Sequence, residues 1–411
     1  MSVFQEEVLN PIEDAMEGRV LKVPIHLDRV KDVLSIRKKI YTVVAGGTGS
    51  GKTSLVDDMY VLQPYELWKA WKDKTDITYK VLYRSMERTL GQKLTKWACW
   101  KLYMDYNILL DSDTLLGYRK SKISREVWDA VVSCRDWADE LLDYVDIRDG
   151  RTTPDDVNKW ITSHALRNGT LYIANDIGIY EAKTPHNYID LFSEDKFITL
   201  KTGDKELVAY VKHNNTDLQM RQGSRKYFPN KPKEITIIIE DHVGKIVAQP
   251  DALTDKAKID KLSSYNSDFR DIFEYSPVAV SQINRAVADI NRIKHSNGDL
   301  SPILDDVKGT GNLVEDCDLL LTLFNPYRYK SFDDNGFYKG YNIRDMMVNP
   351  WGYNRYRLLS ILKNSYGIDD VDYGLKFMGE FNYFSTLPKP GIDGATTPEI
   401  EQVYRDIQNG K

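Results

Sequence analysis

Residues 41–55 read YTVVAGGTGSGKTSL, and this stretch decides the fold. Residues 41–45 form an apolar run typical of a buried strand, a glycine-rich turn follows, and a helix is expected from about Lys52. The turn matches the spacing G-x-x-x-x-G-K-[ST], with its consensus positions at Gly46, Gly51, Lys52 and Thr53. A strand before the pattern and a helix after it predict a phosphate-binding loop.

The chemistry of phosphate binding explains this spacing. Glycines let successive backbone N–H groups converge on an anion, and the N-terminus of the following helix adds partial positive charge. Lys52 can reach the β- and γ-phosphates, and the Thr53 hydroxyl can ligate Mg²⁺. The sequence therefore predicts that ATP and Mg²⁺ are bound, with nucleotide contacts from Gly46, Gly47, Thr48, Gly49, Ser50, Gly51, Lys52, Thr53 and Ser54.

The composition is that of an ordinary globular protein. The chain has 411 residues, of which 42% are apolar and 28% charged, enough for one large α/β domain with additions or for two domains. Lys and Arg number 56 and Asp and Glu 61, so the net charge is −5. Overall charge therefore does not favour nucleic acid, and a site for it has to be a local basic patch.

Cysteine usage indicates a reducing compartment, and hydropathy indicates no membrane span. Cys99, Cys134 and Cys317 are widely spaced and contain no C-x-x-C pair, so neither a zinc site nor a disulfide framework is indicated. No signal peptide is visible, and no run of 18 apolar residues exists. We expect a cytoplasmic protein without a membrane partner, located in the host cytoplasm if a phage encodes it.

A second strand carries the acid that such a site needs. Residues 235–239 read ITIII and are followed by Glu240, Asp241 and His242. An acid at the carboxyl end of a buried strand, downstream of a phosphate loop, can hold the water shell of Mg²⁺. We prefer Asp241 as the metal residue, with Glu240 as the alternative. His242 either lines the site or is a structural histidine.

Two more strands end in polar residues. Glu87 follows the strand expected at residues 77–83, where a carboxylate can orient or deprotonate a water; from the residues alone, a surface glutamate is the favoured reading. Gln282 follows the strand at residues 277–280, where an amide can sense the γ-phosphate.

Three segments of the chain lie outside the predicted nucleotide-binding core. Residues 1–35 form an N-terminal arm that packs either on a neighbouring subunit or on its own domain. Residues 177–234 form an inserted β-rich segment, in which Arg221, Arg225 and Lys226 beside Tyr227 and Phe228 are explained equally by nucleic-acid contact and by a solvated loop. Residues 386–411 are rich in Pro, Gly and Thr at first and then polar, and are expected to be a mobile tail.

The order of motifs resembles a known family. GGTGSGKT, RSMER, IIIEDH, SQINR, DVKGTGNLVEDCDLLL and LKNSYG follow one another as in the RecA-like ATPase domain of DnaB-type replicative helicases, and the helicase half of phage primase-helicases is also similar. The likeness covers residues 36–385. It implies an α/β fold, a RecA-like P-loop NTPase whose mostly parallel central sheet is flanked by helices.

The resemblance also implies roles for individual residues. Glu87 matches the catalytic glutamate, which reverses the reading from the residues alone, and Asp241 matches the metal-binding acid. Gln282 matches the phosphate sensor, and residues 308–312 match a loop that faces single-stranded DNA in a central channel. Lys363 matches a basic residue that reaches the ATP site of the neighbouring subunit.

The chain departs from the family pattern in three places. Ser365 stands where an arginine finger is expected, and Arg355 or Arg357 is the suggested substitute. An arginine finger can contribute ~10³-fold or more in rate, so its absence puts hydrolysis activated by a neighbour in doubt. Neither a helical DnaB-type N-terminal domain nor a primase module precedes the ATPase in this sequence, and the segment 177–234 is additional.

These observations predict an ATP-dependent, ring-forming helicase, hexameric by resemblance, that acts on single-stranded DNA and works with a separate primase or loader. One alternative is a RecA-like recombination or repair ATPase that does not unwind DNA. The other is a regulatory ATP-binding protein derived from a helicase, which is consistent with the missing finger.

Overall fold

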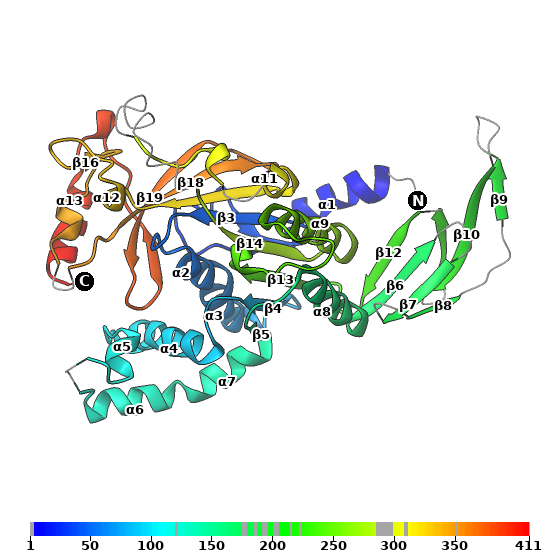
Figure 1. Cartoon of the computed structure of the whole chain (residues 1–411), viewed down its shortest axis with the longest axis horizontal. Coiled ribbons are helices and arrows are strands. Elements are labelled where there is room, and N and C mark those ends of the chain that lie inside the picture. The colour runs from blue at the N-terminus through cyan, green and yellow to red at the C-terminus, as the bar shows by residue number, and fades with distance from the viewer. Residues whose placement is uncertain are drawn as a thin grey trace.

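The computed structural model of the chain describes residues 4–119, 122–174, 179–184, 187–190, 196–199, 205–213, 216–221, 223–284, 299–307, 311–349 and 352–410. Its centre is a nine-stranded sheet with the order β20-β19-β18-β15-β3-β14-β13-β4-β5 (Figure 1). The strands from β15 to β5 are parallel to their neighbours, and the pairs β15–β18, β18–β19 and β19–β20 are antiparallel. The strands span Thr42–Gly46 (β3), Thr78–Ser85 (β4), Val145–Asp149 (β5), Glu234–Asp241 (β13), Ser276–Gln282 (β14), Leu319–Phe324 (β15), Tyr356–Asn364 (β18), Val371–Met378 (β19) and Tyr383–Thr386 (β20).

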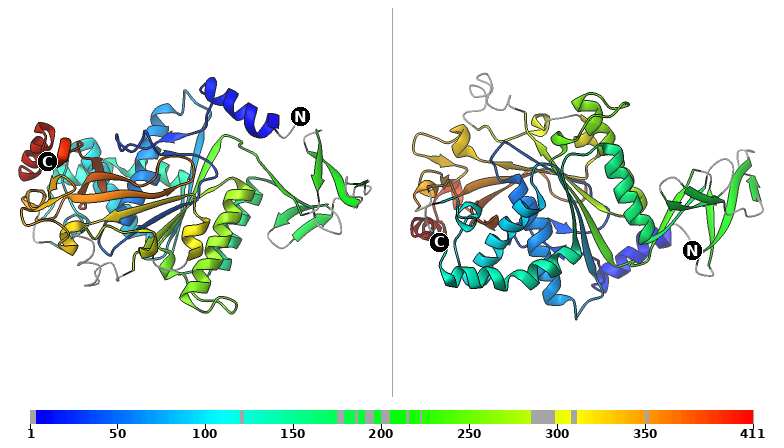
Figure 2. Two further views of the ribbon diagram at one scale, coloured as in Figure 1. Left: turned by 90° about the horizontal axis from the view of Figure 1, so that it is seen from above. Right: turned by 60° about the horizontal axis from the view of Figure 1, so that its bottom comes forward.

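Apolar side chains cover both faces of this sheet, as expected for parallel strands. Alternate residues of one strand enter different clusters: Ile238 packs on one face, and Ile237 and Ile239 on the other. The first face is covered by α8 (Pro154–Arg167) and α9 (Asp255–Phe273), and the second by α2 (Lys52–Asp57), η2 (Asp58–Leu62), α3 (Gln63–Trp71), α4 (Leu90–Tyr106) and α7 (Arg135–Tyr144) (Figures 1 and 2). The predicted α/β architecture with a mostly parallel sheet is confirmed.

Short elements complete this body. Helices α5 (Ser112–Leu115) and α6 (Arg125–Ser133) pack against α4. Near the sheet's edges and loops lie η3 (Val243–Lys245), η5 (Leu304–Asp306), α11 (Gly311–Asp316), α12 (Pro326–Tyr329), β16 (Phe337–Tyr338), β17 (Tyr341–Asn342), η6 (Asp345–Met347) and η7 (Ile392–Gly394).

A β-rich segment projects from one end of the molecule (Figures 1 and 2). It contains a four-stranded sheet, β12-β6-β7-β8, and a three-stranded sheet, β11-β10-β9. The segment includes β6, which begins at residue 169, because β6 pairs with β12 in the first sheet. Its strands are Gly169–Ala174 (β6), Ile179–Thr184 (β7), Asn187–Asp190 (β8), Lys196–Thr199 (β9), Lys205–His213 (β10), Thr216–Arg221 (β11) and Arg225–Pro229 (β12).

The N-terminal arm divides into two parts. Its inner part contains β1 (Val23–Pro24) and β2 (Ser35–Ile36), and its apolar residues are buried in the chain's own core. His26 Nε2 lies 3.1 Å from Oδ2 of Asp58, which ties this part to η2. The outer part, η1 (Gln5–Leu9) and α1 (Asn10–Met16), differs because α1 contains no buried residue.

The C-terminal segment contains a helix where we expected a mobile tail. Residues Pro398–Gln408 form α13, which begins with a cap in which the Thr397 side chain accepts a hydrogen bond from the Ile400 amide. Ile400, Tyr404 and Ile407 are buried, and this spacing places them on one side of the helix. The expectation of a mobile tail was wrong because these three side chains form an apolar stripe that packs the helix against the rest of the chain.

None of the helices in the part of the chain described is both long and apolar enough to cross a membrane.

Candidate active site

The carboxyl ends of four neighbouring parallel strands place the candidate site. Strands β4, β13, β14 and β3 lie side by side, and the residue pairs Ser85–Asp241 and Gln282–Gly46 are in register at their ends. Chain segments that leave parallel strands at this edge bring together residues far apart in sequence. The structure therefore gathers the phosphate loop, Glu87, Asp241 and Gln282 at one edge.

The phosphate loop has the backbone geometry that its glycines allow. Gly49 and Gly51 have φ of +73° and +102°, a region that residues with side chains rarely adopt. A Cβ at Gly46 would lie 2.5 Å from the carbonyl oxygen of Leu323 on the adjacent strand β15. Helix α2 begins at Lys52, as the sequence predicts.

Lys52 is folded into this loop. Its ammonium donates hydrogen bonds to the carbonyl oxygens of Gly46 at 2.8 Å and Gly47 at 3.0 Å. Burial lowers the pKa of Lys52 to about 8, although the carboxylates of Asp241 and Glu87 oppose this shift. The ammonium therefore lies within the loop and close to both acids.

Asp241, and not Glu240, faces the loop. The Thr53 hydroxyl donates a hydrogen bond to Asp241 Oδ1 at 2.9 Å, and Asp241 is 1% exposed. Burial raises its pKa, but the Lys93 charge and the bond from Thr53 outweigh this effect, and the net pKa lies below its ordinary value. Glu240 instead accepts a hydrogen bond from Asn266 of α9 at 2.8 Å, and burial raises its pKa to about 8.

Glu87, His242 and Gln282 line the open side of the site. Glu87 has a half-exposed side chain, and its Oε2 lies 3.8 Å from His242 Nε2. The same ring nitrogen lies 3.3 Å from Gln282 Nε2. Burial lowers the pKa of His242 against the opposing charges of Glu87 and Asp241, which favours the neutral ring. His242 thus joins the predicted base to the predicted sensor.

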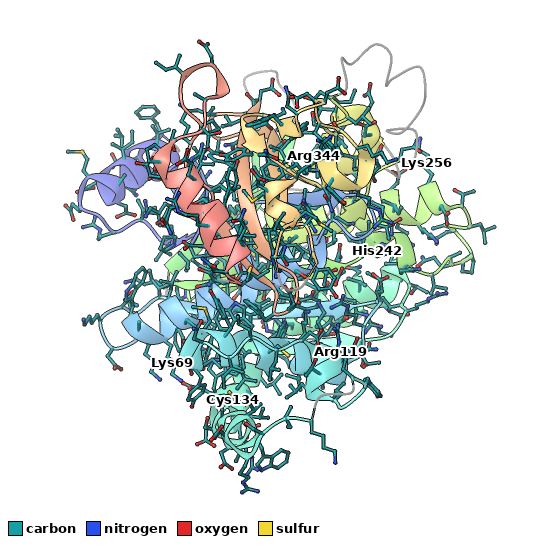
Figure 3. All side chains as sticks on the ribbon, turned by 90° about the vertical axis from the view of Figure 1, so that its left-hand side faces the viewer. Lys69, Arg119, Cys134, His242, Lys256 and Arg344 are labelled. Atoms are coloured by element: carbon teal, nitrogen blue, oxygen red, sulfur yellow. The ribbon has the colours of Figure 1, made fainter. Side chains whose placement is uncertain are left out.

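These residues open into a cavity of about 530 Å³. Further polar residues line the same cavity, among them Lys96, Asp111, Arg119 and Tyr353. Figure 3 labels His242 and Arg119, which lie one above the other in that view. The cavity therefore extends well beyond the space that a single phosphate group would fill.

Two arginines hold the phosphate loop. The sequence does not single out Arg328, and it suggests Arg357 for a different role, that of an arginine finger. Arg328 of α12 donates a hydrogen bond to the Thr48 carbonyl at 2.6 Å, and Arg357 of β18 donates from Nε to the Ser50 carbonyl at 2.7 Å. A signal for Arg328 existed, since it closely follows β15, the strand next to β3. A Cβ at Gly49 would lie 2.5 Å from the guanidinium of Arg328, which would have to shift, and the φ of +73° at Gly49 disfavours residues with side chains in any case.

The suggestion that Arg355 or Arg357 replaces the missing finger is wrong. Arg355 is 2% exposed, and its guanidinium binds both carboxylate oxygens of Glu380 at 2.5 and 2.8 Å. Arg357 is 6% exposed and braces its own loop. Neither side chain is free to reach another subunit.

The structure does not bring Lys363 to this site. Strand β18 runs antiparallel to β15. Leu359 of β18 pairs with Leu323, which in turn pairs with Gly46 of the phosphate loop, whereas Lys363 pairs with Leu320, three residues before Leu323 in β15. The Lys363 ammonium donates to the carbonyl oxygens of Val314 and Glu315, both at 2.9 Å, at the end of α11. Lys363 therefore lies toward the opposite edge of the sheet from the phosphate loop.

A second cation besides Lys363, the guanidinium of Arg37, lies near Ser365. Ser365 is exposed, and its amide donates to the Asp318 carbonyl at 2.9 Å. The next residue, Tyr366, is 56% exposed, and the guanidinium of Arg37 lies 4.5 Å from the centre of its ring.

The structure describes the two segments considered for DNA contact to different extents. Residues 308–310 of the loop 308–312 lie outside the described residues, and Gly311 begins α11. In the other segment, the Tyr227 hydroxyl donates to the Ala165 carbonyl at 2.8 Å and its ring packs on Phe273. Phe228 packs against Tyr172, so both aromatic residues serve packing, while Arg225 is exposed 3.9 Å from Asp268. Arg221 belongs to β11 and Lys226 to β12.

Comparison with known proteins agrees on the fold. No protein-family model matches the sequence, and no curated protein matches it. Among solved structures, an isolated helicase ATPase domain is similar over 94% of this chain and 100% of its own, with a TM-score of 0.59 and 12% identity. A DnaB-like replicative helicase, solved in work on its interactions with primase, is similar over 94% of this chain and 67% of its own, with a TM-score of 0.56 and 12% identity. The chain thus has the RecA-like fold of DnaB-type helicase ATPase domains.

Proposed function

We propose that this chain is a Mg²⁺-dependent ATP hydrolase of the DnaB-like helicase type that acts on single-stranded DNA. The observation that carries the proposal is the bond between Thr53 and Asp241, with Lys52 in the adjacent loop and Glu87 opposite. A phosphate-loop hydroxyl, an acid on a neighbouring strand and a carboxylate at the rim are the groups that such hydrolysis requires.

The residues present fit Mg²⁺. The ion prefers oxygen ligands and keeps several waters, and the Thr53 hydroxyl and the Asp241 carboxylate offer oxygens 2.9 Å apart. Bound there, Mg²⁺ would neutralise charge on the β- and γ-phosphate oxygens. Thr53 would contact the ion directly and Asp241 would hold its water shell.

The other residues divide the remaining work. A triphosphate in the loop would give Lys52 charged acceptors, which bind an ammonium more strongly than the carbonyl oxygens of Gly46 and Gly47. Glu87 would orient and deprotonate the attacking water, and Gln282 would sense the γ-phosphate through its contact with His242. The nucleoside would occupy the far part of the cavity, beside Asp111 and Tyr353.

The helicase assignment adds DNA and neighbouring subunits. The position of Lys363, far from its own phosphate loop, is compatible with a role at the ATP site of the next subunit in a hexameric ring. Exposed apolar side chains on the outer arm, such as Phe4, Ile12 and Met16, favour assembly with other copies. Residues 308–312 are the proposed DNA loop, and a separate primase or loader in the cytoplasm is the proposed partner.

Strand displacement tests this assignment. The wild-type protein should separate a forked duplex in the presence of Mg-ATP, whereas Lys52→Ala protein should not. Turnover stimulated by single-stranded DNA without strand displacement would favour the recombination-type ATPase. Nucleotide binding without any turnover would favour the regulatory protein.

A further inference from the structure

A fully buried lysine lies directly behind the proposed metal site. Lys93 of α4 is 0% exposed. Its ammonium donates to Asp57 Oδ1 at 3.0 Å and Oδ2 at 3.2 Å, and to Asp241 Oδ2 at 3.2 Å. Asp57 ends helix α2, which begins at the phosphate loop, so one ammonium joins the loop's helix to the acid of β13.

Neutral donors surround the same two carboxylates. The Tyr83 hydroxyl lies 2.9 Å from Asp57 Oδ1 and 3.2 Å from Asp241 Oδ2, and it also contacts the Lys93 ammonium. Trp97 donates from Nε1 to Asp57 at 3.1 Å. Asp57 is 0% exposed, so this cluster excludes solvent and fixes each oxygen by named partners.

The two oxygens of Asp241 therefore have separate partners. Oδ1 accepts from Thr53, the metal-site hydroxyl, and Oδ2 accepts from Lys93 and Tyr83. Removing one partner from a buried charge cluster is strongly destabilising, because the remaining charges stay buried without compensation. Without Lys93, the carboxylates of Asp57 and Asp241 would face each other with no cation between them, and their repulsion would turn Asp241 away from Thr53.

We propose that Lys93 is a positioning residue, which holds Asp241 in the orientation that serves Thr53 and Mg²⁺ by neutralising the adjacent carboxylate of Asp57. This inference rests on the proposed function, because it concerns the same metal site. It assigns Lys93 no contact with nucleotide; Lys93 acts only through Asp241.

The test measures nucleotide binding, not turnover. The dissociation constant of a fluorescent ATP analogue is determined with Mg²⁺ and with EDTA, and the ratio of the two gives the gain due to the metal. In Lys93→Met protein this gain should fall by about 10- to 100-fold, as is typical when a partner of a metal ligand is lost, while binding in EDTA stays near the wild-type value. Asp57→Asn/Lys93→Met protein should recover most of the gain, because the repelling carboxylate is also gone.

Lys101→Met is the matched control. Lys101 lies on the same helix and pairs with Glu66 at 2.9 Å and Asp105 at 3.1 Å, and it is not part of this cluster. Its loss should leave the metal-dependent gain unchanged. A wild-type gain in folded Lys93→Met protein, or a double variant that recovers nothing, would overturn the inference; the double variant also decides the matter if the single variant does not fold. A wild-type protein that binds no nucleotide would instead overturn the proposed function.

Discussion

Thr53 and Asp241 are 188 positions apart in the chain, and the hydroxyl of the first donates a hydrogen bond to the carboxylate of the second at 2.9 Å. Strand β14 lies between β3 and β13 in the sheet, yet the two residues meet because Asp241 ends β13 and Thr53 lies in the first turn of α2, the helix that follows the loop after β3. Lys52, Thr53 and Glu87 line the same cavity, and the Glu87 side chain is half-exposed there.

Replacing Glu87 by glutamine should separate binding from turnover. The amide keeps the shape of the side chain but cannot accept a proton, so ATP binding should persist while the hydrolysis rate falls by ~10²- to 10⁴-fold. Phosphate release and nucleotide affinity are the two measurements. Glu401→Gln, at an exposed position of α13, is the control. Equal loss of binding and turnover in Glu87→Gln protein would point to a structural role.

Lys363 should complete the ATP site of a neighbouring subunit. Lys363→Ala and Lys52→Ala proteins should each be inactive, and their mixture should regain activity at interfaces where both residues are intact. If the double variant Lys52→Ala/Lys363→Ala takes the place of Lys363→Ala protein in the mixture, no activity should return. Because an ammonium stabilises the transition state less well than a planar guanidinium, Ser365→Arg should raise turnover.

Normal hydrolysis by Lys363→Ala protein, or an inactive mixture with proven subunit exchange, would exclude Lys363 from that role. Arg37, stacked on Tyr366 beside Ser365, would then be the next residue to replace.

Residues 308–312 should contribute to DNA binding. Lys308→Ala should weaken binding to single-stranded DNA and reduce the salt dependence of the affinity, because fewer counterions are released. Fluorescence anisotropy over a range of salt concentrations measures both. Lys330→Ala, in the turn after α12, is the control, and an unchanged salt slope in Lys308→Ala protein would move the DNA site elsewhere, with Arg225 next in line.

His164 should make the fold sensitive to acid. Burial lowers its pKa from 6.5 to about 4, helped by the charges of Lys80 and Arg167. The unfolded chain therefore binds the proton more readily between these values, so the stabilising contribution is present above pH 6.5 and is lost as pH falls toward 4. From pH 7 to 5 this loss is about 2 kcal/mol for the wild type. The free energy of unfolding of His164→Gln protein should fall less between these pH values, and urea unfolding at pH 7 and pH 5 measures it. Equal falls in the two proteins would refute the assignment.

The sequence was sufficient for the fold because its strongest signals are local. The phosphate-loop pattern and the run of residues 235–239 each predicted a strand and the polar residues after it, and parallel topology then brought them to one edge. Helix α13 also had a local signal, the capped start at Thr397 and the spacing of Ile400, Tyr404 and Ile407.

Contacts between side chains of different elements could not be predicted. Lys93 is 36 positions from Asp57 and 148 from Asp241, and nothing in the local pattern of α4 separates a buried lysine from an exposed one. From the sequence Arg357 is a candidate finger for a neighbouring subunit, and only the structure shows that it is buried and bound to the Ser50 carbonyl of its own phosphate loop. Such pairings depend on how helices pack on the sheet, which single-sequence periodicity does not encode.

The most direct test is steady-state phosphate release from Mg-ATP, with and without single-stranded DNA. The account predicts turnover that DNA stimulates and that Lys52→Ala abolishes while the circular dichroism spectrum stays unchanged. Lys256→Ala, an exposed lysine on α9 that Figure 3 labels, should behave as wild type. Turnover at the wild-type rate in Lys52→Ala protein would contradict the account.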